Sequence, residues 1–342
     1  MGIKHLISFE DWIIDDISSL LQLSMDMKRE RYNKKWSNYL LNKIFLMIFY
    51  NPSLRTRLSF ETGITELGGH GIFWSPEMGW IKNQYHKGES LQDAANVISR
   101  FASGVGIRIT LDAITKYGEG NKFLQEYARH SSIPIINMAD DMSHPCQAIS
   151  DLLGWYEYLF KDDVIFNPKK LKGRKVLFTW GKSDLARPWS TVQSHLLLAA
   201  RYGMNVALAR PDGYDLDLNI YSKVKQYCNK ANTDFSIISN SEDGYDNTDI
   251  VYVRNWVSPF AYNNNFFQKK EESEKAMKFI DWIVTAKKMA RTNNAAFTNP
   301  MPIDRDNEAT NEVINSCNSI MYNVAENRLH TQKAIMSYLL HN

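Results

Sequence analysis

Short apolar runs alternate with amphipathic segments along most of the chain, and this alternation limits the fold more than any other feature. The run KIFLMIFY at 43–50 is apolar throughout and short, as is typical of a parallel strand buried on both faces. The next segment starts near Ser53 and stops before Gly68, which predicts a helix. In the same way we expect strands at 71–75, 104–109 and 133–139, and helices at 10–29, 90–102, 120–131 and 146–160.

The pattern starts again after the Pro- and Lys-bearing stretch at 161–175. Strands are predicted at 175–180, 204–211, 249–256 and 282–287, and helices at 191–203, 220–232 and about 327–340. The polar stretch 263–275 is interpreted as a solvated excursion. Two successive repeats predict an α/β protein with two doubly wound parallel-sheet domains, whose ligands lie at the carboxyl ends of the strands.

Size and composition agree with this fold and exclude several functions. The 342 residues exceed an ordinary single domain, and a net charge of +2 with scattered basic residues argues against nucleic-acid binding or membrane-surface binding. Three dispersed cysteines are too few for a disulfide framework or a zinc site, and no run approaches the 18 apolar residues of a membrane span. We therefore expect a soluble, cytoplasmic protein without a metal.

Residues 53–57, SLRTR, are the strongest functional signal in the chain. They lie where a predicted strand ends and a predicted helix begins, so unpaired backbone N–H groups and the helix dipole favour the binding of an anion there. Ser53 and Thr56 add hydroxyl donors, and Arg55 and Arg57 add guanidinium groups that match phosphate oxygens. The alternative is a Ser53 that only caps the helix, with the arginines in solvent. Because neither common nucleotide loop occurs in the chain, a small phosphorylated ligand is favoured over a nucleotide.

Other polar residues fall at strand ends and helix starts, where an α/β domain binds ligands. Arg108 ends a predicted strand, and His144 and Gln147 follow another in SHPCQ. A lone histidine is more often a cap or a core residue, and this reading stays open for His144. Arg328 lies near the start of the last predicted helix.

Together these segments resemble the aspartate/ornithine transcarbamylase family. S-x-R-T-R is the carbamoyl phosphate motif of that family, and further matches follow in family order: GESLQDAANVIS, GIR, HPCQ, GRKVLFTW, DIVYVRNW, NPMP and ENRLH. The chain is most similar to the branch of N-acetylornithine and N-succinylornithine transcarbamylases, which carries NPS-x-RTR, the TNN triplet and ENRLH-x-QKAIM.

The resemblance implies a site for carbamoyl phosphate. Its phosphate would be bound by Ser53, Leu54, Arg55 and Thr56. Arg108 would bridge the phosphate and the carbamoyl oxygen, His144 would bind that oxygen, and Gln147 the amide, and these three with Arg328 would be the catalytic residues. The late loop would contribute Met301. Trp80 resembles a tryptophan that reaches the site of a neighbouring subunit, which implies a homotrimer with shared active sites.

The acceptor side matches the family less well. The resemblance assigns it Asp140, Arg254, Lys182 and Pro300. The late loop is Asn299-Pro300-Met301-Pro302 instead of the His-Cys-Leu-Pro of ornithine-type enzymes. Gly88 stands where acetyl-type enzymes have Glu and succinyl-type enzymes have Pro, and Glu308 replaces a lysine that is common in the branch. These differences indicate an altered acceptor.

We therefore expect a carbamoyltransferase, a transferase of one-carbon groups, that uses carbamoyl phosphate and an N-acetylornithine-type acceptor in a reaction like that of arginine biosynthesis, without a cofactor. A different amine or ureido acceptor, or a catalytically silent homologue that only binds ligand, are the alternatives. The expected domains are 1–148, completed by 325–342, for carbamoyl phosphate, and 149–324 for the amino acid. A trefoil knot in the second domain is left open.

Overall fold

The computed structural model describes residues 3–75, 89–263 and 266–341. Contacts divide the chain into two compact units: a first unit of Met1–Cys146 with Asn327–Asn342, and a second unit of Gln147–Glu326. The boundaries expected from the sequence, 148 and 325, lie two residues from these divisions. The end of the chain thus returns to the first unit.

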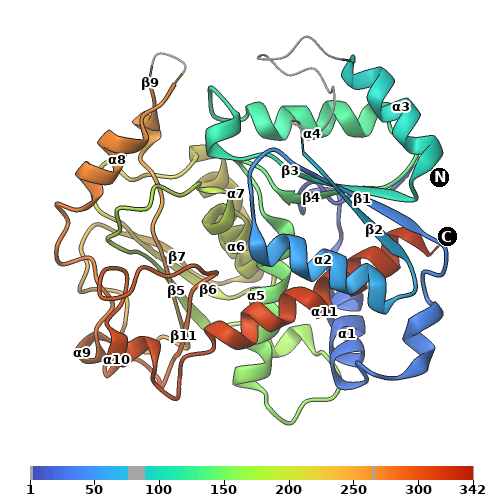
Figure 1. Cartoon of the computed structure of the whole chain (residues 1–342). Coiled ribbons are helices and arrows are strands. Elements are labelled where there is room, and N and C mark those ends of the chain that lie inside the picture. Colours follow the sequence, from blue (N-terminus) through green and yellow to red (C-terminus); the bar gives the residue numbers. More distant parts are fainter. Residues whose placement is uncertain (1–2, 76–88, 264–265, 342) are drawn as a thin grey trace. The chain divides into compact units, whose positions relative to one another are not determined.

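The first unit is built on a four-stranded sheet in the order β2-β1-β3-β4, with every pair parallel. Its elements are α1 (Ile14–Arg29), β1 (Ile44–Phe49), α2 (Leu54–Glu66), β2 (His70–Trp74), α3 (Leu91–Phe101), β3 (Gly104–Arg108), α4 (Glu119–His130) and β4 (Ile135–Ala139). Short 3₁₀ turns cover Lys34–Asn38 and Leu111–Ala113. Figure 1 shows α3 and α4 on one face of this sheet, and α2 and α11 (Met321–Leu340) on the other.

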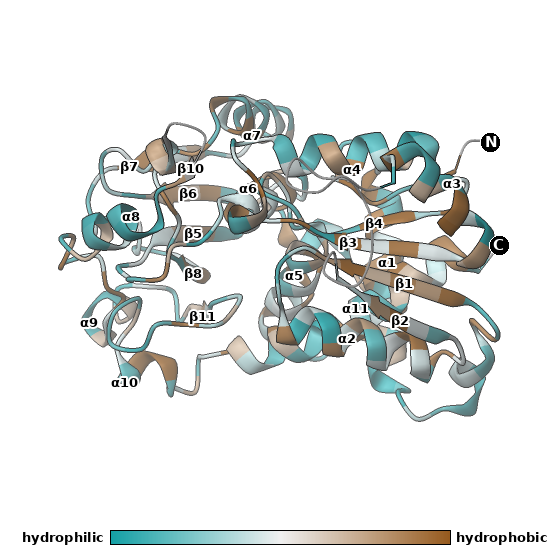
Figure 2. Ribbon diagram, turned by 45° about the horizontal axis from the view of Figure 1, so that its top comes forward, coloured by the Kyte–Doolittle hydropathy of each residue, from teal (hydrophilic) through white to brown (hydrophobic). Residues whose placement is uncertain are grey.

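The strands of the first unit are apolar because both faces of the sheet are covered. Figure 2 shows the hydrophobic colour along β1, β3 and β4, while the covering helices carry hydrophilic stretches. Helix α11 (Met321–Leu340) packs closely on α2: a Cβ at Gly63 would lie 3.0 Å from Met336 Cε and 3.2 Å from Lys333 Cγ. Lys333 is buried there and its Nζ pairs with Glu66 Oε2 at 2.9 Å.

The second unit holds a parallel sheet in the order β11-β8-β5-β6-β7. Its elements are α5 (Pro145–Leu159), β5 (Lys175–Trp180), α6 (Ser190–Arg201), β6 (Asn205–Ala209), α7 (Leu218–Ala231), β7 (Phe235–Ile238), β8 (Ile250–Arg254), β9 (Tyr262–Asn263), β10 (Phe266–Phe267), α8 (Lys269–Ala276), α9 (Ala286–Met289), β11 (Ala296–Thr298) and α10 (Asn311–Ile314). Further 3₁₀ turns cover Pro168–Leu171 and Pro259–Ala261. Two parallel sheets with helices confirm the predicted fold class.

The predicted strand at 282–287 is wrong. Val284 forms one isolated bridge with Ala309, and α9 starts two residues later, where the Thr285 side chain accepts from Lys288 N. Trp282 is buried against the Trp180 ring, 6.2 Å between centroids, so side-chain packing rather than strand pairing explains the apolar residues. The edge strand is β11, fourteen residues after Trp282.

Other segments also differ from the prediction. The first helix begins at Ile14 instead of residue 10, and the last begins at Met321 instead of about 327. The polar stretch 263–275 contains most of helix α8, in which Glu272 is buried and accepts from Ser258 N at 2.7 Å and Ser258 Oγ at 2.6 Å. Charge alone therefore did not indicate exposure there.

Two glycines with positive φ allow the cost of backbone strain to be distinguished from the cost of a steric clash. A Cβ at Gly68 (φ +85) would lie 2.1 Å from the Ser37 carbonyl oxygen, whereas one at Gly173 (φ +80) would meet no atom within 4 Å. We expect Gly173→Ala to cost about 1 kcal/mol for the left-handed conformation. Gly68→Ala should cost about 2–4 kcal/mol in total, because overpacking adds to that strain. Chemical denaturation of both variants measures the difference, and equal losses would show that the Ser37 backbone yields freely.

Candidate active site

The carboxyl ends of β1 and β3 meet where the strand order of the first sheet reverses. Phe49 is paired with Arg108, and beyond the ladder Tyr50 N donates to Arg108 O at 2.9 Å. Asn51 Oδ1 accepts from Thr110 N at 2.6 Å, which ties the two loops together. Ligands of doubly wound sheets bind at such a reversal.

Helix α2 begins at this reversal. The side chain of Ser53, the residue before the helix, does not cap it. Ser53 precedes the helix with φ −157 and ψ 110, and its side chain makes no cap hydrogen bond. Its Oγ donates to Thr56 Oγ1 at 2.9 Å, and Arg328 Nη2 donates to the same oxygen at 2.9 Å. Because Thr56 Oγ1 accepts twice, its own O–H is directed to a further acceptor. The cap alternative does not describe this hydroxyl pair.

Three arginines from distant parts of the first unit concentrate positive charge at the site. Arg328 on α11 is 3% exposed, and the Nε of Arg108 is buried without a hydrogen-bond partner in the described part of the chain. Burial, with the charges of Arg328 and Arg55, lowers the pKa of Arg108 to about 10. Mutual repulsion of this kind is relieved by a bound anion.

Two neighbours of this cluster point elsewhere. Arg57 Nε pairs with Glu61 Oε1 at 2.9 Å, and its guanidinium lies 3.9 Å from the centroid of the Phe73 ring. The prediction that Arg57 helps to bind the anion is therefore not supported. The Leu54 side chain is 70% exposed, so any part that Leu54 has in the site belongs to its backbone.

The loop before α5 presents His144, and a buried carboxylate shapes that loop. Asp140 is fully buried, and its oxygens accept from Asn121 Nδ2 at 2.7 Å, Asn137 Nδ2 at 2.9 Å and Met142 N at 2.8 Å. Burial and the neighbouring Asp141 raise the pKa of Asp140 to about 7. These contacts hold the turn before His144, and the expected contact between Asp140 and a substrate stays a prediction.

In the second unit, Arg254 ends β8 opposite the end of β5, at the reversal of the second sheet. It is 7% exposed, and its Nη1 lies 3.4 Å from the Pro302 carbonyl oxygen. Arg187 Nη2 donates to the same oxygen at 2.8 Å, and Arg187 Nη1 pairs with Glu308 Oε2 at 2.8 Å.

Glu308, which the sequence analysis named only as the replacement of a lysine on the acceptor side, is a structural anchor. It is fully buried, and it accepts from Asn255 N and Asp304 N, each at 2.8 Å. Its contacts therefore connect the end of β8, the 302–304 segment and Arg187. No sequence pattern joins Arg187 and Glu308, because 121 positions separate them.

The unusual late loop is held by its first residue. Asn299 is fully buried, donates from Nδ2 to Val253 O at 2.9 Å and accepts at Oδ1 from Met301 N at 2.7 Å. Met301 has φ 54, a left-handed conformation. Asn299 thus fixes the backbone of the loop without the usual histidine and cysteine.

The remaining predicted residues are placed as follows. Pro300 is buried in the late loop, and Lys182, half-buried, follows β5 with its N donating to Trp282 O at 2.8 Å. Trp80 and Gly88 lie outside the described residues. Among the described residues no group of three or more His, Cys, Asp or Glu could hold a metal. No helix within those residues is long and apolar enough to cross a membrane.

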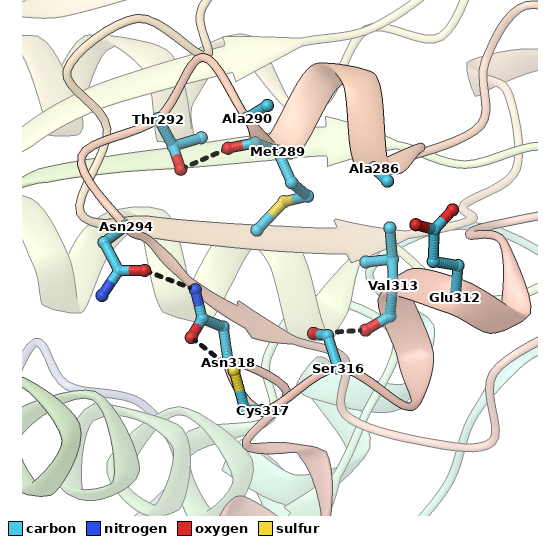
Figure 3. A pocket seen from close by; sticks show the side chains of 10 residues that line it. All are labelled: Ala286, Met289, Ala290, Thr292, Asn294, Glu312, Val313, Ser316, Cys317 and Asn318. Carbon is cyan, nitrogen blue, oxygen red and sulfur yellow. Dashed lines mark hydrogen bonds between the residues drawn. The ribbon is translucent and has the colours of Figure 1, made fainter.

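A hollow of about 370 Å³ in the second unit contains none of the predicted residues. Figure 3 shows hydrogen bonds made by polar side chains of its lining: Asn318 Nδ2 donates to Asn294 Oδ1 at 2.8 Å, and Ser316 Oγ donates to the backbone carbonyl of Val313 at 2.8 Å. We assign no ligand to this hollow.

If the arginine cluster binds an anion, inorganic phosphate should stabilise the protein. At ten times its Kd, phosphate would add about 1.4 kcal/mol, a rise of a few degrees in Tm. Arg328→Met should remove most of the rise, while Arg57→Met should keep it because Arg57 contacts Glu61 and Phe73. Thermal scans in phosphate and in chloride of equal ionic strength test this, and equal shifts in both variants would contradict it.

The Arg187–Glu308 pair predicts a large loss on neutralising one partner. Both side chains are at most 6% exposed, so Glu308→Gln leaves a buried guanidinium without its counter-ion and should cost about 3–5 kcal/mol. Glu272→Gln is the matched control, because Glu272 accepts only from the neutral Ser258 groups in the bonds described above. It should cost about 1–2 kcal/mol in the same denaturation experiment. A smaller loss for Glu308→Gln than for the control would contradict the anchoring role.

Comparison with known proteins agrees with this geometry. Residues 4–157 match the family model of the carbamoyl-P binding domain of aspartate/ornithine carbamoyltransferase, and residues 173–339 match its Asp/Orn binding domain. The ornithine carbamoyltransferase of Archaeoglobus fulgidus is 32% identical over 98% of this chain and 97% of that protein. The N-acetylornithine carbamoyltransferase of Xanthomonas axonopodis pv. citri is 30% identical over 99% of this chain and 97% of its own length.

Solved structures give the same result. An acetylornithine transcarbamylase complexed with acetylcitrulline superposes with a TM-score of 0.87 at 28% identity, covering 99% of both chains. A variant of N-acetyl-L-ornithine transcarbamylase with carbamyl phosphate and N-succinyl-L-norvaline also superposes with a TM-score of 0.87, at 29% identity over 98% of this chain and 100% of that one. The chain belongs to the aspartate/ornithine carbamoyltransferase family, and it is a carbamoyltransferase by that membership.

Proposed function

We propose that the protein transfers the carbamoyl group of carbamoyl phosphate to the side-chain amine of an N-acylated ornithine of the N-acetylornithine type. The observation that carries this proposal is the Ser53–Thr56–Arg328 hydrogen-bond chain beside Arg108, which offers hydroxyl and guanidinium donors to one anion. The acyl group is supported by the acetylornithine transcarbamylase structures named above.

In this proposal the phosphate is bound at the start of α2, through Ser53, Thr56 and the backbone of Leu54 and Arg55. Arg108 bridges the phosphate and the carbamoyl oxygen, and His144 donates to that oxygen. Gln147 binds the carbamoyl amide, and the backbone at Met301 assists it. Arg328 adds charge beside Thr56, where it donates at 2.9 Å.

The chemistry requires these donors. An uncharged amine attacks the carbamoyl carbon, so a C–N bond forms while negative charge grows on the carbonyl oxygen. The C–O bond to phosphate then breaks, phosphate leaves, and the amine loses one proton. Fixed donors stabilise the developing charge, and each is typically worth on the order of 3 kcal/mol. Holding both substrates in place supplies much of the remaining rate gain.

Arg254 is the proposed partner of the acceptor carboxylate, with Lys182 and Pro300 beside the same substrate. A guanidinium matches a carboxylate with two parallel N–H donors. The acceptor identity is less constrained than the donor, because ornithine carbamoyltransferases are as similar in sequence as the acetylornithine enzymes. The product, an acylcitrulline, would then serve arginine biosynthesis in the cytoplasm. We further propose a homotrimer in which Trp80 reaches the site of a neighbouring subunit.

The decisive experiment is phosphate release from carbamoyl phosphate with ornithine, N-acetylornithine, N-succinylornithine, aspartate and putrescine as acceptors. We expect turnover with an acylornithine and little with free ornithine. Turnover only with another amine would support the alternative that the enzyme uses a different amine acceptor. Binding of carbamoyl phosphate without turnover of any acceptor would support a silent homologue.

A variant of Arg254 tests the acceptor site separately from the donor site. Loss of a charge-assisted pair worth about 1.5–3 kcal/mol should raise the KM for the acceptor about 10- to 100-fold in Arg254→Met. The KM for carbamoyl phosphate should change less than about threefold. Arg254→Lys is the matched control: it keeps the charge but loses the two parallel donors, so its KM for the acceptor should lie between those of the original protein and Arg254→Met. Equal changes in both KM values would contradict the assignment.

A further inference from the structure

We infer that Asp151 and His195 form a positioning pair that fixes which end of the Gln147 amide faces the carbamoyl group. The inference rests on the proposed function of Gln147. Gln147 and Asp151 lie one turn apart on α5, and Gln147 Nε2 donates to Asp151 Oδ1 at 2.7 Å. The other oxygen, Asp151 Oδ2, lies 2.9 Å from His195 Nε2, and His195 Nδ1 lies 2.5 Å from the Thr191 carbonyl oxygen.

The positions of the protons in the hydrogen bonds from Gln147 to Thr191 follow from the groups that take part in them. The Thr191 carbonyl can only accept, so His195 Nδ1 carries a proton. A contact of 2.9 Å between Nε2 and Asp151 Oδ2 then requires one more proton, on either atom. In both cases Asp151 Oδ1 has no proton to donate. It therefore accepts from Gln147, which directs Nε2 toward Asp151 and Oε1 away from it.

The surroundings keep this arrangement rigid and dry. Gln147 is 3% exposed, Asp151 is fully buried and His195 is 1% exposed. The His195 ring lies 4.7 Å from the ring of Tyr252, 5.7 Å from Trp155 and 6.3 Å from Phe178, measured between centroids. Burial and the Asp151 charge raise the pKa of Tyr252, which agrees with a carboxylate enclosed in this aromatic shell. Hydrogen bonds are strong in such an environment, so reversing the amide would be costly.

The orientation has a consequence for ligand choice. A carbamoyl group ends in an NH₂ donor, and it needs an acceptor opposite it. With Oε1 directed away from Asp151, Gln147 supplies that acceptor, whereas the reversed amide would set two donors against each other. Acetyl phosphate has a methyl group at the same place and cannot donate. Asp151 and His195 would therefore determine the preference for carbamoyl phosphate over other acyl phosphates, although neither is proposed to touch the ligand.

Substitutions of similar size at Asp151 test whether this residue sets the direction of the hydrogen bond to Gln147. In Asp151→Leu, the side chain that accepts from Gln147 Nε2 is lost, so the Gln147 amide is no longer held in one orientation. We expect the ratio of Kd values for acetyl phosphate and carbamoyl phosphate, measured by titration calorimetry, to fall about threefold or more toward unity. Affinity for inorganic phosphate should stay within about threefold.

A second substitution should keep the preference. In Asp151→Asn, the introduced side chain donates from its NH₂ to His195 Nε2, which carries no proton in the neutral ring, and its oxygen accepts from Gln147 Nε2. The Gln147 amide keeps its orientation, so the Kd ratio should stay within about threefold of that of the original protein. Tyr156→Phe is the control on the same helix, because it removes the hydrogen bond from Asn167 N to Tyr156 Oη, 2.9 Å, without touching the chain from Gln147 to Thr191. It should leave the ratio unchanged.

The outcomes separate this inference from the proposed function. No acceptor is present in the titrations, so an error in the acceptor does not affect them. If the original protein prefers carbamoyl phosphate and folded Asp151→Leu keeps that preference, the positioning role is wrong while the function stands. If the original protein binds no carbamoyl phosphate, the function is wrong. Neutron diffraction of the unaltered protein then still tests the orientation, since two deuterons on the Gln147 atom facing Asp151 support it and none would overturn it.

Discussion

Parallel pairing of β1 with β3 is the constraint that positions the arginine cluster and the start of α2. The ladder sets Phe49 beside Arg108, so the loop that leads into α2 and the guanidinium that ends β3 emerge at one edge. Close packing at Gly106 in β3 helps to fix this register, because a Cβ there would lie 2.7 Å from Met138 Sδ and 2.9 Å from Phe45 Cζ, so a larger residue does not fit at that position. Thr56 and Arg108 therefore owe their proximity to backbone hydrogen bonds formed elsewhere in the strands.

Much of this arrangement could be predicted from the sequence. The apolar runs gave β1 and β5 to within a residue or so, because strands buried on both faces have little freedom of composition. The SLRTR segment indicated an anion site, since it stands between a strand and a helix. The segment 282–287 was mistaken for a strand because Trp282 and Val284 are buried by side-chain contacts, a distinction that local sequence does not contain.

The parts that could not be predicted are contacts across long sequence separations. Arg187 and Glu308, or Asp151 and His195, reveal their pairing only when helices and strands have been placed. Asp140 is a further example: its type and position suggested a ligand contact, and the structure shows that its oxygens also accept from Asn121, Asn137 and the backbone. Such internal hydrogen bonds, which shape the loop before His144, are not visible in the sequence.

The position of Arg328 on α11 has a consequence for synthesis of the protein. The sheet of the first unit is encoded by the first 139 residues, but the guanidinium that contacts Thr56 comes from a helix at the opposite end of the chain. A nascent chain still lacking α11 can pair β1 with β3, yet it has neither that donor nor the Lys333 partner of Glu66. The arginine cluster is therefore completed long after its sheet, so a product interrupted between β4 and α11 would bind an anion poorly.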